Sequence, residues 1–168
     1  MSTRRTGLVM MALAWVVGGA LLALVFNRTL DDRHNPNDNP DTRTRGELVE
    51  VTLRANRQGH FVAGGEVNGQ RARFLLDTGA TDVVLSAELA ERAGLTRGRA
   101  SRARTANGTI TVYDTVINRV RLGGIELPRV NASINPRMSG DHVLLGMSFL
   151  GQLELVQRDG TLVLRQHP

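Results

Sequence analysis

The hydrophobic and polar positions divide this chain of 168 residues into three stretches of different character. Residues 7–26 carry no charge and consist mostly of Leu, Val, Ala and Met. Residues 27–46 contain almost no large apolar side chain. From Glu47 onward, short runs rich in Val, Leu and Ile are separated by glycine-containing turns. The pattern predicts one folded domain over 47–168, preceded by an apolar segment and a linker.

The apolar segment 7–26 is long enough to cross a membrane as a helix. At about 1.5 Å per residue it would span roughly 30 Å of hydrocarbon. Arg4 and Arg5 precede it, which favours a cytoplasmic location for residues 1–6 and a periplasmic location for the domain. A cleaved signal peptide is the alternative, although its apolar core usually has about 7–15 residues. We therefore expect a single-pass anchor in the inner membrane.

Residues 27–46 are predicted to be a flexible linker. The stretch is rich in Asp, Asn, Arg and Thr and contains Pro36 and Pro40. Such a segment cannot bury enough apolar surface to offset the conformational entropy that is lost on ordering. The folded domain is therefore expected to begin near Glu47.

The remaining residues have the pattern of short β-strands. Asn68-Gly69 and Asn107-Gly108 each join two strand-like runs, and Asn-Gly is a strong hairpin signal because both turn residues need positive φ. Ser86 can cap a short helix over 87–93, and residues 147–150 form a helical turn. The sequence predicts an all-β domain, a small closed β-barrel with one or two short helices. Expected strands are 47–53, 61–67, 71–76, 81–85, 99–106, 109–122, 125–134, 142–146, 152–157 and 161–165.

The amino-acid composition excludes several kinds of functional site. Without cysteine, the chain has neither disulfides nor thiolate chemistry. His60 and His142 are isolated from other metal-ligating residues, so we expect no metal site, and no motif indicates a cofactor. The net charge of +5 permits contact with an anionic surface, but the arginines are spread along the chain, and we expect no nucleic acid partner. The densest series, Arg92 to Arg104, is interpreted as a solvated face, with binding of an acidic substrate, lipid headgroups or nucleic acid as the alternative.

One acidic residue stands in an unusual place. Asp77-Thr78-Gly79-Ala80 follows the apolar run Phe74-Leu75-Leu76 and precedes a second one, 83–85. Burial of a carboxylate is costly unless the group finds a partner or shifts its pKa. The Asp-Thr-Gly triplet occurs once, so chemistry that needs two such carboxylates would take the second from another molecule. An Asp that only caps its own turn is the alternative.

The order of these features resembles the retropepsin-like aspartic proteases, and more narrowly their bacterial, membrane-anchored, single-domain relatives. The resemblance is carried by the Asn68-Gly69 hairpin, the Asp77 motif, the long central hairpin and the run from Val143 to Leu150. It covers about 59–164. One departure concerns an acidic residue and an arginine that pair in retroviral enzymes, because Thr81 and Met147 stand at those positions here.

The resemblance implies a role for each site residue. Asp77 would be the catalytic aspartate, Thr78 would lock two subunits together across a two-fold axis, and Gly79 would let the substrate approach. The Tyr113-Asp114 pair would be structural. The substrate-binding groove and flap would comprise Ala80, Asp82, Thr105, Ala106, Asn107, Gly108 and Thr109, and the loop would be supported by Leu144, Leu145 and Gly146.

The expected function is that of a membrane-anchored aspartic endopeptidase acting on polypeptides as a homodimer. A water between two Asp77 carboxylates would attack the peptide bond, with one carboxylate ionised and the other protonated. A domain that only dimerises or binds peptide is the alternative. No cofactor is expected in either case.

Overall fold

The computed structural model describes residues 13, 15–17, 35–105 and 108–168. The chain divides into two units, 1–34 and 35–168. In the first unit, residues 13 and 15–17 are helical and their side chains are exposed. The predicted membrane anchor falls largely outside the described residues. Within the described part of the chain, no helix combines the length and the apolarity needed to cross a membrane.

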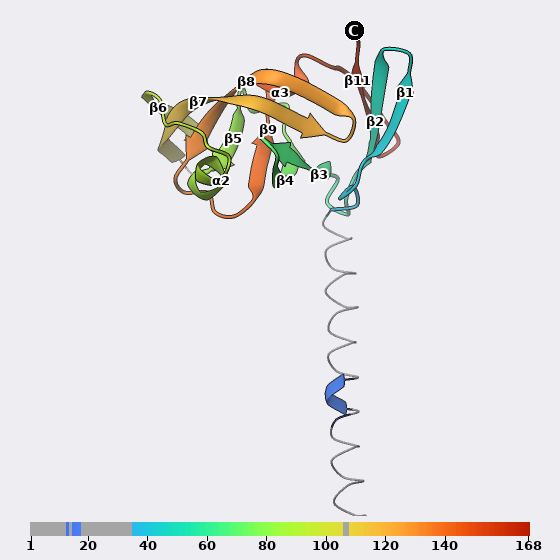
Figure 1. Ribbon diagram of the computed structural model, residues 1–168, viewed down its shortest axis with the longest axis horizontal. Helices are drawn as coiled ribbons and strands as arrows, with labels where there is room; N and C mark the ends of the chain where they lie inside the picture. The colour runs from blue at the N-terminus through green and yellow to red at the C-terminus, as the bar shows by residue number, and fades with distance from the viewer. Residues whose placement is uncertain (1–12, 14, 18–34, 106–107) are drawn as a thin grey trace, which may run out of the picture. The chain divides into compact units, whose positions relative to one another are not determined.

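The second unit is a mostly β domain whose strands form two sheets (Figure 1). The smaller sheet is antiparallel with strand order β1-β2-β11-β10. The larger has order β3-β4-β9-β5-β8-β7-β6, and β3 also pairs with β7. Two short helices are α2 (Ala87–Arg92) and α3 (Met147–Leu150). The strands are β1 (Asp41–Arg45), β2 (Leu48–Arg54), β3 (Val62–Val67), β4 (Gln70–Leu76), β5 (Val83–Ser86), β6 (Ala100–Thr105), β7 (Gly108–Leu122), β8 (Ile125–Asn135), β9 (His142–Leu145), β10 (Glu154–Arg158) and β11 (Thr161–Gln166).

This arrangement confirms the predicted fold class as a mostly β domain with two short helices. Every strand expected from the sequence is present, with ends that shift by one or two residues. The strands are divided between two sheets, where the sequence predicted one closed barrel. Periodicity fixes which residues form strands, but the pairing partners depend on contacts between distant segments.

The Asn68-Gly69 turn and the Ser86 cap predicted from the sequence are confirmed. For the second predicted turn, Asn107 lies outside the described residues, and Gly108 is the first residue of β7 and pairs with Thr105. Asn68 and Gly69 have φ of 49° and 80° in the turn between β3 and β4. At the start of α2, the Ser86 hydroxyl accepts a hydrogen bond from the Leu89 N–H at 3.1 Å. Gly94, with φ of 65°, follows the end of that helix. Such features depend on the backbone preferences of one or two residues, so a local sequence predicts them.

One hydrophobic core joins the two sheets and the helices. Phe74 on β4, Phe149 on α3 and Leu53 on β2 are fully buried members of the same cluster. Its members extend from Val51 to Leu164. Residues 35–168 therefore form one compact unit that contains the whole described core, as a domain able to fold alone does.

Residues 35–46 belong to the folded domain, which corrects the predicted linker boundary. β1 pairs along its whole length with β2. Asn35 and Asn37 are buried, with 6% and 5% of their surface exposed. The Asn37 amide accepts the Arg54 N–H at 2.7 Å and donates to the carbonyls of Arg54 and Val62 at 2.9 and 2.7 Å. The linker prediction considered apolar burial alone, whereas strand pairing and buried amide hydrogen bonds order this segment.

Candidate active site

Asp77 directly follows β4, beside the end of β9. The two strands are parallel neighbours, and their register places Leu76 opposite Leu145. The Asp77 N–H donates to the Leu145 carbonyl at 3.1 Å, which extends the pairing by one residue. The chain then turns away, so the carboxylate stands where two adjacent strands of the larger sheet end.

The Asp77 loop, residues 77–82, is a tight turn closed by its own polar groups. The Gly79 N–H donates to Asp77 Oδ1 at 2.9 Å, and the Ala80 N–H donates to the Asp77 carbonyl at 3.2 Å. Asp77 is half-buried, while Thr78 and Gly79 are exposed. The carboxylate thus caps its turn and also reaches the surface. The costly full burial considered for it in the sequence does not occur in the single chain.

The residues that follow β9 donate hydrogen bonds to the backbone of this loop. The N–H groups of Met147 and Ser148 donate to the carbonyls of Ala80 and Thr81, both at 2.8 Å. Leu145 is fully buried. A side chain at Gly146 would overlap the Asp82 carbonyl and lie 2.7 Å from the Ala80 oxygen. The loop can approach α3 this closely only because the residue there is glycine.

Ser148 is a supporting residue that the sequence reasoning missed. Its hydroxyl accepts the Val83 N–H at 3.0 Å and donates to the Asn131 carbonyl at 2.7 Å. One side chain therefore joins the start of α3 to β5 and β8. The only signal in the sequence was its position inside the run 143–150, because its partners are remote along the chain.

Replacing Gly146 by Ala is expected to destabilise the domain by about 1–3 kcal/mol, since the added methyl group collides with backbone carbonyls that cannot rotate away. Urea unfolding would measure the loss. Thr81→Ala is the matched control, because Thr81 is an exposed residue of the same loop whose backbone contacts would persist. Equal stability of the Gly146 variant and the parent chain would contradict the close packing described above.

The predicted flap corresponds to the hairpin of β6 and β7. Thr105 and Gly108 are paired at its end, and Arg104 pairs with Thr109, which is exposed. Ala106 and Asn107 lie outside the described residues. At the base of the hairpin, the Gly98 N–H donates to the Asp114 carbonyl at 2.7 Å.

Asp114 also accepts the Ser101 hydroxyl at 3.1 Å. These contacts tie Asp114 on β7 to β6 and to the residues before it, and the structural role of the Tyr113-Asp114 pair stays a prediction.

Asp82, predicted to contact substrate, lines an open pocket of about 720 Å³. The pocket extends from the Asp77 loop to the segment after α2 and to β7 and β8. Its lining is mostly polar and includes Thr96, Asp114, Asn118 and Asn131. Asp77 itself is not among the lining residues. Asp82 therefore lies beside a pocket whose lining also includes Gly98 and Asp114, at the base of the β6–β7 hairpin.

The geometry brings together the predicted catalytic loop and its predicted support. Leu144 pairs with Leu75 of β4 and with Val84 of β5, so it lies beside both strands that flank the loop. Within the described residues, no hydrogen bond or ion pair joins Asp77 to another carboxylate. Within the described residues Asp77 therefore has no carboxylate partner, and two-carboxylate chemistry at Asp77 would need a second carboxylate from elsewhere. The catalytic and binding roles themselves stay predictions.

The segment that carries this site is similar to known proteins. A family model described as gag-polyprotein putative aspartyl protease matches residues 63–152, which include the Asp77 loop and its support. A crystal structure of a retropepsin-like aspartic protease from Rickettsia conorii is 28% identical, with a TM-score of 0.59. The match covers 76% of this chain and 95% of that chain.

Two curated relatives are uncharacterised proteins. One, encoded in the cobV 5′ region of a Sinorhizobium species, is 33% identical over 64% of this chain. The other, from Rickettsia prowazekii, is 28% identical over 74% of this chain. The chain spans about half the length of these relatives, 48% and 54%. Because the family model covers more than half of its residues, this chain belongs to the retropepsin-like family of gag-polyprotein putative aspartyl proteases.

Proposed function

We propose that this protein is a membrane-anchored aspartic endopeptidase that works as a homodimer. The observation that carries the proposal is the Asp77 loop. Its carboxylate is accessible, and its turn is closed by the Gly79 N–H. Its backbone is held by Leu145 at the end of β9 and by Met147 and Ser148 after it. A half-buried but accessible carboxylate on a held turn suits a catalytic group better than a structural one.

Two copies of the loop would supply the catalytic pair. Carboxylates about 3 Å apart cannot both ionise, so one proton is shared and the pair titrates as a unit. The ionised member would take a proton from the attacking water, and the protonated member would polarise the scissile carbonyl. The exposed Thr78 and Gly79 flank the carboxylate and would contact the partner subunit and the substrate, respectively.

The hairpin of β6 and β7 would close over the bound peptide. A closed hairpin excludes bulk water, which strengthens the electrostatic contacts of the catalytic pair. The uncharged segment 7–26 would hold the protein in the inner membrane, with residues 1–6 in the cytoplasm and the domain in the periplasm. Confinement to one membrane would raise the effective concentration of the domains and favour their pairing.

Incubation of the purified protein with a peptide library over a range of pH tests the proposal. We expect cleavage whose specific activity falls when the protein is diluted, because a dimeric site is lost on dissociation. Mass spectrometry of the products would give the cleaved bonds. Binding of peptides without cleavage at any pH or protein concentration would instead identify the domain as a peptide-binding or dimerisation module.

A further inference from the structure

The outer face of the β6–β7 hairpin carries arginines that the peptidase proposal does not use. Alternate residues of a strand share a face, and directly paired residues lie on the same side. Arg102 pairs with Thr111 and Arg104 with Thr109, and all four are exposed. Between them Ile110 points to the opposite, buried side. We define Arg102, Arg104, Thr109 and Thr111 as the hairpin basic face.

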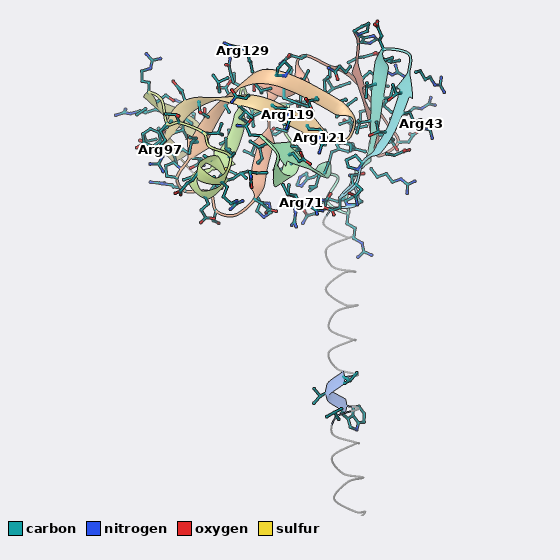
Figure 2. The ribbon with its side chains drawn as sticks, viewed as in Figure 1. Arg43, Arg71, Arg97, Arg119, Arg121 and Arg129 are labelled. Carbon is teal, nitrogen blue, oxygen red and sulfur yellow. The ribbon has the colours of Figure 1, made fainter. Side chains whose placement is uncertain are left out.

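Arg97 adds a further cation next to this face. Its guanidinium carbon lies 5.4 Å from the centre of the Tyr113 ring, and Tyr113 pairs with Ala100 on the same side of the hairpin. Figure 2 shows Arg97 at the end of the domain where β6 and β7 lie. Stacking on the ring leaves the positive charge of Arg97 in place and fixes its position.

Several arginines elsewhere in the domain have acidic partners. Arg71 pairs with Asp38 at 2.6 Å, Arg121 pairs with Glu66, and Arg165 contacts Glu50 at 2.7 Å. On the hairpin, Arg99 makes one long contact of 3.9 Å with Asp114. Among the described residues, Arg102 and Arg104 have no ion pair. Their charges are therefore available to an external anion, with two threonine hydroxyls beside them as hydrogen-bond donors.

We propose that the hairpin basic face binds the anionic phospholipid headgroups of a membrane surface. Guanidinium groups pair with phosphate through two parallel hydrogen bonds, and adjacent hydroxyls add further donors. A bilayer is favoured over an acidic polypeptide because the same chain carries the uncharged apolar segment 7–26, whereas nothing in the domain indicates an acidic protein partner. The interaction does not involve Asp77, but this face lies on the β6–β7 hairpin, which the proposed function closes over the bound peptide.

Co-sedimentation of residues 35–168 with lipid vesicles tests this assignment. This part contains the complete described core and lacks the apolar segment, which would enter any bilayer. We expect binding to vesicles that contain phosphatidylglycerol and little binding to phosphatidylcholine alone. Each arginine near an anionic surface contributes about five-fold, so Arg102→Gln with Arg104→Gln should weaken binding roughly 25-fold. In about 1 M salt the binding should disappear, because the Debye length falls to about 3 Å.

The matched control changes the same amount of charge elsewhere. Arg57→Gln with Arg137→Gln removes two exposed arginines outside the hairpin and should leave most of the binding intact. Asp77→Asn should bind vesicles like the parent domain. Equal losses in the two arginine pairs would show a diffuse effect of net charge and overturn the proposal. So would displacement from vesicles by inorganic phosphate at the headgroup concentration, or preferential binding of polyglutamate.

Discussion

Replacing Asp77 by Asn is expected to abolish peptide cleavage while the domain stays folded. In a homodimer one substitution removes both catalytic carboxylates, so the loss is expected to be on the order of a thousand-fold or more in kcat. The Asn side chain keeps an oxygen that can accept the Gly79 N–H, which preserves the turn. Product formation by mass spectrometry and the circular dichroism spectrum together measure the effect. Asp159→Asn is the control, because Asp159 lies in the exposed turn between β10 and β11.

Mixing the two forms tests whether the active site needs two subunits. With free exchange and equal amounts of the parent chain and Asp77→Asn, about one quarter of the dimers hold two Asp77 carboxylates. The activity of a fixed amount of parent chain should then fall to about half. An unchanged activity would mean that a single chain hydrolyses peptides alone, and the dimeric mechanism would be wrong.

Removing the segment before β2 is expected to unfold the domain. A fragment of residues 47–168 lacks β1 and Asn37, so the Arg54 N–H and the carbonyls of Arg54 and Val62 lose the partners that they have in the folded chain. These hydrogen bonds are part-buried, so their loss costs about 1 kcal/mol or more each, and the whole pairing of β1 with β2 is lost as well. The sum approaches the total stability of a domain of this size. Residues 35–168 should remain folded. Circular dichroism and urea titration of the two fragments would show the difference.

A single substitution separates the contribution of the Asn37 amide to stability from that of β1. Asn37→Ala leaves β1 in place and should lower stability by about 3 kcal/mol, or roughly 10 °C in Tm. Asn39→Ala is the matched control, because Asn39 is exposed and lies two positions further on. Similar Tm values for the two variants would mean that water replaces the Asn37 amide without cost.

The difference between the two asparagines could not be read from the sequence. Asn35, Asn37 and Asn39 alternate with other small polar residues and proline, and each is typical of a linker. Asn37 is buried, and its amide donates hydrogen bonds to the carbonyls of Arg54 and Val62. These two residues lie 17 and 25 positions further along the chain. Ser148 is a similar case, since its partners lie 65 and 17 positions away. Both side chains make non-local hydrogen bonds, for which no local pattern exists.

Local chemistry, by contrast, determined much of the fold and the position of the candidate site. The Asn68-Gly69 turn, the Ser86 cap and the alternation of the strands act within a few residues, so the sequence alone located every strand except β1, and also the Asp77 turn. The tertiary structure decided how these strands divide between two sheets and that the domain begins at Asn35. It also decided that Gly146 and Ser148 hold the Asp77 loop. Those features arise where backbone and side chains from distant segments meet, and only the folded chain brings them together.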